Sequence, residues 1–435
     1  MKNSMIKRIL DCLKVKQEKN ELKDYSVRIN NTKTLEQFFV IQALETTRET
    51  ETSEAEVTVY KTVGEDLLGQ SSFVISHEMS KNEIDKAIDK ALFSASFVKN
   101  KAYELVSGEK KMKKVRKAAS LDQFELLQDI ALEYIKASVD NKDYSVKFNS
   151  LELFYNENDV RLINSKGVDY EKKTSEIMIE AIPSYTNKKN NFKTELYRMF
   201  KYTNIDGELL NKVYKDASEA VSDCLLRADA KTNDGKKVLK VILRNNDIRK
   251  LFDEVISTYG YNSVYNKGNL HSIGDSIQGK AKTKLDIKLC KMSKEDFFDG
   301  EGILLKDIEL VKGGKLVSYF GGQRFASYLG MKPTGSLGLL KIAKGKKSIS
   351  ELEKDPYLEI IDLSGIQCDV FQGFLGGEIR LAKYFDGKNC YPISGLSFST
   401  SLENAINNFE FSSEETAISG YNGPKYMVIG NVEIN

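Results

Sequence analysis

The side chains that most often bind catalytic metals are scarce in this sequence. It contains two histidines, His77 and His271, which lie far apart along the chain. A catalytic zinc ion needs about three protein ligands, usually histidine with carboxylate or cysteine, together with an open fourth position. The sequence has no HExxH or HxH element and no CxxC pair. It therefore predicts neither a metal site nor a bound cofactor.

Adjacent carboxylates at Asp253 and Glu254 begin the most suggestive segment, residues 252–274 (FDEVISTYGYNSVYNKGNLHSIG). Its helical start leads into an aromatic loop interrupted by glycines. A solvated surface is the simpler interpretation of two adjacent acids, and a hydrolase that uses both with another metal is an alternative. Glycine-rich stretches at 334–338 (TGSLG) and 373–377 (GFLGG) match neither a Walker loop nor a dinucleotide fingerprint. They are better interpreted as turns and bulges.

The charges nearly cancel, with 65 Lys and Arg, 63 Asp and Glu, and a net charge of +2. Nucleic-acid-binding proteins usually show a clear basic excess, so we expect no direct binding to nucleic acid. Five scattered cysteines, an odd number, indicate a reducing compartment. The first residues carry too short an apolar run for a signal peptide, and no stretch approaches the ~18 apolar residues of a membrane span. We expect a cytoplasmic protein with no membrane segment.

Hydrophobic periodicity predicts an α+β first domain over residues 1–230, with helices packed on an antiparallel sheet. Ser80 and Glu83 match the S-x-x-E capping box, which predicts a helix over 80–98. Other helices are predicted at 35–50, 121–139 and 206–227. Strands are predicted at 55–60, 71–76, 145–155, 160–164 and 175–182, with a turn at 156–159.

The polar stretch 229–237 (DAKTNDGKK) marks the predicted domain boundary. Beyond it, strand patterns dominate and glycines are dense, as turns and bulges require. The second domain, 231–435, is therefore expected to be β-rich, either a sandwich or barrel-like.

Several segments, taken in their order along the chain, resemble the TldD/PmbA family, whose members are called modulators of DNA gyrase or peptide-maturation metalloproteases. The resemblance covers nearly the whole chain. It is carried by four segments: 55–103, 161–182 (with the N-S-x-G strand pair), 298–330 (beginning FDGEG) and 377–408 (beginning GEIR).

The family contains members that resemble a zinc protease, with HExxxH on a helix and a distal cysteine, and metal-free members that pair with them. When the chain is aligned with the family without gaps on Lys267-Gly268, HExxxH falls on 253–258. The stretch 262–267 (NSVYNK) is similar to the VYRK of the metal-free kind, with Asn266 in place of the arginine. Glu254 keeps the acid, whereas Asp253 and Thr258 replace the histidines. The distal cysteine region resembles 419–423 (SGYNG), which has no cysteine. The resemblance implies a metal-free PmbA/TldE-type chain without catalytic or metal-binding residues.

The resemblance also implies partners. The chain would pair with a zinc-bearing TldD-like sister subunit and help to enclose unfolded peptide for proteolysis or peptide maturation. A stand-alone homodimer that binds peptide or another ligand is the alternative, and either would form a dimer. The candidate residues of the peptide cleft or interface directly follow the lost metal motif: Tyr259, Tyr261, Tyr265, Lys267 and His271.

Overall fold

The computed structural model describes residues 3–76, 78–108, 113–116, 122–232, 237–279, 281 and 283–435. His77 lies outside these residues. The elements form one long sheet in the N-terminal half and two sheets in the C-terminal half, with helices on both parts. This is the α+β class that the sequence predicts.

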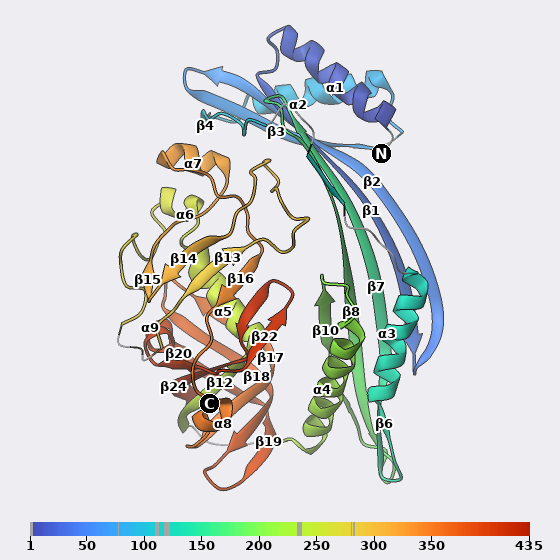
Figure 1. The fold of residues 1–435 in the computed structure, drawn as a ribbon, viewed down its shortest axis with the longest axis vertical. Helices are drawn as coiled ribbons and strands as arrows, with labels where there is room; N and C mark the ends of the chain where they lie inside the picture. The colour runs from blue at the N-terminus through green and yellow to red at the C-terminus, as the bar shows by residue number, and fades with distance from the viewer. Residues whose placement is uncertain are drawn as a thin grey trace.

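The first sheet has the strand order β10-β8-β7-β1-β2-β3-β4, with β5, β6 and β9 added at its sides. All its pairings are antiparallel except that of β5 with β8. Its long strands curve along one side of the molecule (Figure 1). The strands are β1 (Asp24–Val40), β2 (Ala43–Gly64), β3 (Leu67–Ser76), β4 (Asn100–Lys101), β5 (Lys113–Arg116), β6 (Val139–Asp140), β7 (Tyr144–Asn164), β8 (Asp169–Asn187), β9 (Lys193–Glu195) and β10 (Arg198–Tyr202).

The helix predicted at 35–50 is wrong, because these residues form a β-hairpin of β1 and β2. Ile41 and Gln42 have positive φ angles of 47° and 70° at its turn. The helix-like apolar spacing arises because both faces of β1 carry apolar side chains. Phe39 packs under helices, whereas Phe38 forms an edge-to-face contact with Phe154 on the other face, with ring centroids 5.9 Å apart.

The turn predicted at 156–159 is also wrong, because β7 continues through it. Asn156 accepts a hydrogen bond from the hydroxyl of Thr34 (2.8 Å), and Asn158 accepts one from Thr32 (3.0 Å). Residues that favour turns locally therefore form polar pairs across the sheet, and these pairs support the extended strand.

Among the described residues, four helices cover the sheet. Two hydrophobic cores separate it from α1 (Asn3–Glu18) with α2 (Lys81–Ala95) near one end, and from α3 (Gln123–Ala137) with α4 (Leu209–Asp229) near the other. The capping box of Ser80 and Glu83 is present at the start of α2, as predicted.

The C-terminal half contains a five-strand barrel. In its eight-stranded sheet, β18, β17, β12, β24 and β20 follow one another, and the β18–β20 pairing closes the ring. This confirms the barrel-like expectation. The strands of this sheet are β11 (Lys231–Thr232), β12 (Lys237–Arg244), β17 (Tyr357–Asp369), β18 (Phe374–Phe385), β19 (Cys390–Ser394), β20 (Leu396–Ser401), β21 (Phe409–Phe411) and β24 (Tyr426–Ile434).

A six-stranded sheet packs beside the barrel in a shared hydrophobic core. Its strands are β13 (Ile287–Cys290), β14 (Ile308–Lys312), β15 (Lys315–Leu316), β16 (Leu339–Ile342), β22 (Glu415–Ile418) and β23 (Tyr421–Pro424). The helices of this half are α5 (Asn245–Ser257), α6 (Tyr261–Tyr265), α7 (Gln323–Leu329), α8 (Ile349–Leu352) and α9 (Leu402–Asn407).

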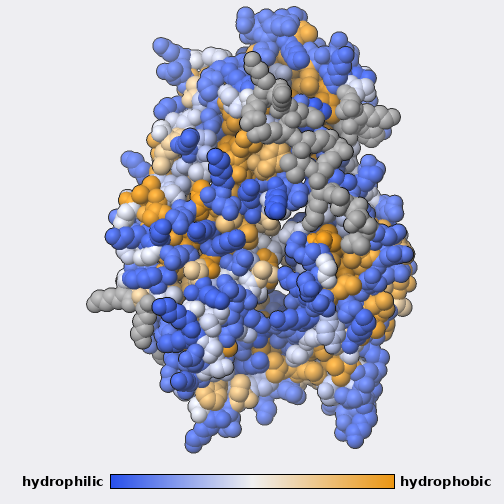
Figure 2. Space-filling model, viewed as in Figure 1, coloured by the Kyte–Doolittle hydropathy of each residue, from blue (hydrophilic) through white to orange (hydrophobic). Residues whose placement is uncertain are grey.

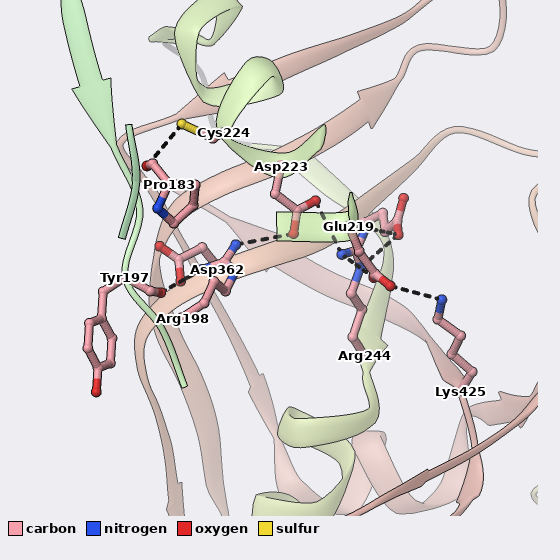
Figure 3. Close-up of polar contacts among 10 residues, drawn as sticks. Pro183, Tyr197, Arg198, Glu219, Asp223, Cys224, Arg244, Asp362 and Lys425 are labelled. Carbon is pink, nitrogen blue, oxygen red and sulfur yellow. Dashed lines mark hydrogen bonds and ion pairs between the residues drawn. The ribbon is translucent and has the colours of Figure 1, made fainter. Parts of the chain in front are cut away.

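A buried ion-pair network joins the two halves (Figure 3). Arg198 on β10 contacts Asp223 of α4 at 3.2 Å and Asp362 of β17 at 3.1 Å. Arg244 on β12 contacts Glu359 at 2.8 Å and Asp223 at 3.6 Å. Because each arginine reaches carboxylates from both halves, the network fixes α4 and the edge of the first sheet against the barrel.

The molecular surface is mostly hydrophilic on the side shown in Figure 2, and its apolar residues form separate areas. None of the helices in the described part of the chain combines the length and apolar character needed to cross a bilayer.

Candidate functional site

Helix α5 and its C-cap Thr258 carry residues 253–258, the positions that the resemblance aligns with the metal motif. Its apolar side, which includes Leu251 and Phe252, packs into the core of the barrel half. This arrangement leaves Asp253 and Glu254 on the exposed side. The helical period therefore explains the order of residues here, with apolar positions turned inward and the two acids turned outward.

Neither histidine replacement offers a free metal ligand. The buried hydroxyl of Thr258 donates to the carbonyl oxygen of Val255 at 2.7 Å. Asp253 forms an ion pair with Arg249, one turn earlier, at 3.3 Å. Partial burial raises the pKa of the Asp253 carboxyl, and the Arg249 guanidinium opposes that shift.

Arg249 also reaches the segment that resembles the distal cysteine region. Its Nη1 donates to the carbonyl oxygen of Ser419 at 2.6 Å. Gly420 has a φ of +75°, and a Cβ there would lie 2.7 Å from the guanidinium carbon. A guanidinium thus fills the space between α5 and residues 419–420.

These residues do not fit a zinc ion. Zinc requires imidazole, thiolate or carboxylate donors at a fixed geometry, whereas here a permanent cation lies beside a paired acid and an engaged hydroxyl. Within the described ranges, no group of three or more His, Cys, Asp or Glu residues could hold a metal ion. Sequence reasoning missed Arg249, although its i, i+4 spacing to Asp253 was a usable signal.

Of the five candidate cleft residues, the structure brings Tyr259 and His271 into contact. The Tyr259 hydroxyl lies 2.9 Å from Nδ1 of His271. Burial raises the pKa of Tyr259 and lowers that of His271. Tyr319 donates its hydroxyl to the His271 carbonyl oxygen at 3.0 Å, which fixes the loop that carries the imidazole. Burial thus favours the neutral imidazole, which can exchange a hydrogen bond with a ligand.

The other three candidates lie apart from this pair. Tyr261 is buried, and its hydroxyl donates to the Lys332 carbonyl oxygen at 2.8 Å, which is a structural contact. Tyr265 is 41% exposed and its ring contacts that of Tyr328 at a tilt of 48°, with ring centroids 5.1 Å apart. Lys267 is exposed, with a φ of +60° just after α6. The assignment of these residues to a peptide cleft stays a prediction.

Comparison with known proteins shows what the chain is similar to. Residues 237–435 match the family model of the PmbA/TldA metallopeptidase C-terminal domain. No curated protein matches the sequence.

Three solved structures share the whole fold. TldE from Thermococcus kodakarensis superimposes with a TM-score of 0.75 at 11% identity, covering 98% of this chain and 99% of its own. A protein of Thermotoga maritima described as a modulator of a DNA gyrase superimposes with a TM-score of 0.77 at 15% identity. The match covers 99% of this chain and 100% of that protein. A protein of Bacteroides thetaiotaomicron described as a modulator of DNA gyrase superimposes with a TM-score of 0.79 at 15% identity. The match covers 100% of this chain and 99% of that protein.

At these identities, the structural likeness establishes the fold alone. The family model adds the sequence evidence over the C-terminal half, where α5 and the 419–423 segment lie. Residues 237–435 therefore belong to the PmbA/TldA metallopeptidase C-terminal domain family, and the chain has the fold of the three solved structures.

Proposed function

We propose that this chain is a non-catalytic, PmbA/TldE-like subunit of a two-chain metallopeptidase, in which a zinc-bearing TldD-like partner supplies the metal. The observation that carries the proposal is the Arg249 guanidinium, which bridges Asp253 and Ser419 where a catalytic member would need metal ligands. The fold shared with a TldE structure supports the same assignment.

The first sheet offers a surface for extended peptide. Strand β10 ends the strand order and pairs with β8, and no other described strand bonds its outer edge. Tyr197, directly before the strand, is 52% exposed, and Met199, within it, is 58% exposed. An edge with free backbone groups and nearby apolar side chains suits β-strand addition of an unfolded segment.

The proposed partnership operates in the cytoplasm. All five cysteines, each within the described ranges, are free thiols, and burial raises the pKa of the Cys224 thiol to about 11. Unpaired, protonated thiols suit a reducing compartment.

The experiment is to isolate the untagged protein from its native cell at near-physiological salt and to identify what elutes with it. The proposal expects a protein of the same family that carries HExxxH, in a fixed ratio to this chain. A single species that contains this chain alone, at every protein concentration, would instead favour the stand-alone homodimer.

A further inference from the structure

A polar cavity of about 110 Å³ lies between the first sheet and the C-terminal half, far along the chain from the lost metal motif. Two cross-strand pairs of β1 and β2 form one wall, Ser26 opposite Thr58 and Arg28 opposite Glu56. The remaining lining consists of Tyr60, Leu105, Val106, Asn164, Gly300, Glu301 and Gln323. A cavity of this size and polarity holds several atoms of a polar ligand.

Arg28 is the uncommitted charge of this cavity. Its Nε donates to Asn30 Oδ1 at 3.2 Å, and no described carboxylate forms an ion pair with it. Its Nη1 lies 3.6 Å from where a Cβ on Gly300 would stand. Arg28 and Gly300 also line a small adjoining pocket of about 20 Å³. The free edge of the guanidinium therefore remains available to an anion.

The two acids of the cavity limit which anion fits. Glu301 is engaged, because its Oε2 accepts the backbone N–H of Gln323 at 2.7 Å, and burial raises its pKa. Glu56 is exposed and stands directly across from Arg28. A dianion such as phosphate would be repelled by both acids, whereas a carboxylate carries one charge, and a neighbouring peptide N–H can donate to Glu56.

An aromatic row connects the cavity with a candidate cleft residue. The ring of Tyr60, which lines the cavity, lies 6.4 Å from that of Tyr103, and Tyr103 lies 6.1 Å from Tyr328. Tyr328 in turn contacts Tyr265 on α6 at 5.1 Å. Tyr60 and Tyr103 belong to a buried cluster, so packed rings link the cavity to the exposed Tyr265.

We infer that Arg28, with Ser26 and Glu56, binds a carboxylate of an extended peptide, either its C-terminus or an acidic side chain. This inference rests on the proposed role in peptide handling and names the group that is recognised. Arg28 takes the carboxylate in a forked hydrogen bond, while Glu56 accepts the adjoining backbone N–H.

The test uses the full chain alone, with peptides as probes. Because the chain has no tryptophan, an N-acetylated hexapeptide with one tryptophan and four or five alanines reports its binding through its own fluorescence anisotropy. Three forms are compared: a free C-terminal carboxylate, a C-terminal amide, and an amide with one internal aspartate.

The inference predicts that at least one of the two carboxylate-bearing peptides binds about tenfold more tightly than the plain amide. Arg28→Gln should abolish that preference, and Arg28→Lys should keep part of it because it retains the charge. Lys33→Gln is the matched control, since Lys33 lies on the same strand but on the opposite face and pairs with Glu51. It removes an equal charge and should keep the full preference.

Tight binding of the internal-aspartate amide would identify the acidic side chain as the source of the carboxylate, and weak binding would identify the C-terminus. Equal binding of all three peptides to the unaltered chain would overturn the inference even if Arg28→Gln failed to fold. So would an Arg28→Gln variant that folds and keeps the preference. Either result leaves the partner-dependent function untouched, because that function is measured by cleavage with the partner present.

Discussion

Arg249 Nη1 donates a 2.6 Å hydrogen bond to the carbonyl oxygen of Ser419, 170 residues further along the chain. The bond joins the helix that the resemblance aligns with the metal motif to the loop that it aligns with the distal cysteine. A guanidinium stays protonated at any physiological pH, so a fixed positive charge occupies this junction and disfavours a second cation there.

This charge leads to the prediction that the purified, untagged protein contains far less than one zinc ion per chain. Metal analysis after dialysis against zinc measures the zinc content per chain. The His271→Ala variant should have the same zinc content, because the His271 imidazole is already hydrogen-bonded to Tyr259. A stoichiometric zinc that disappears in His271→Ala would show a metal site that the donor geometry does not explain.

The ion-pair network in Figure 3 should contribute strongly to stability. Arg244→Gln leaves Asp223 and Glu359 buried beside fewer positive charges, and breaking a buried pair in this way costs about 3–5 kcal/mol. Urea unfolding measures the loss. Lys240→Gln is the control, because Lys240 pairs with Asp355 at the surface, and its free energy of unfolding should hardly change. Equal effects would mean that the network contributes little.

Asp247 should make stability depend on pH. Burial, together with the neighbouring Asp362, raises its folded-state pKa to about 6, whereas an unfolded aspartate titrates near about 3.9. The native state therefore binds more protons between these values. The stability that the protonated Asp247 contributes is fully present below about pH 4 and is lost as the pH rises through about 6.

Asp247→Asn removes this penalty, so its melting temperature should exceed that of the unaltered chain at pH 7, and the difference should shrink toward pH 4. Glu254→Gln, on the exposed side of the same helix, should show no such trend. A pH-independent difference for Asp247→Asn would contradict the raised pKa.

The local signals in the sequence predicted local structure well. The S-x-x-E pattern identified the start of α2, and apolar spacing identified α3 and α4, because capping and amphipathic packing depend on neighbouring residues. The β1–β2 hairpin was missed because its threonines and glutamates are extended by pairing across the sheet, as Thr34 with Thr50. Local patterns carry no information about such pairs.

The candidate site shows the same limit. The 252–274 segment could be singled out from its residues, and the contact of Tyr259 with His271 lies within it. The cavity could not be predicted, because Arg28 and Glu301 come from opposite halves of the chain and meet through tertiary packing.

We also predict that the chain alone forms a homodimer. Exposed apolar side chains occur near α6 and in the β17–β18 turn, with Tyr265 at 41%, Ile273 at 47% and Phe371 at 72% exposure. Covering them would stabilise an assembly. Light scattering should give a mass near twice 49.1 kDa. A monomer throughout the micromolar range would count against self-association.

The most direct measurement of the central claim mixes this chain with a TldD-like partner that carries HExxxH and follows cleavage of an unfolded fluorogenic peptide. A metal-bound water in the partner would attack the carbonyl, while this chain would help to hold the peptide in position. The account predicts cleavage by the mixture and by neither chain alone. Changing the partner's HExxxH glutamate to glutamine should abolish cleavage, whereas Glu254→Gln here should leave it nearly intact. Cleavage by this chain alone, abolished by Glu254→Gln, would contradict the account.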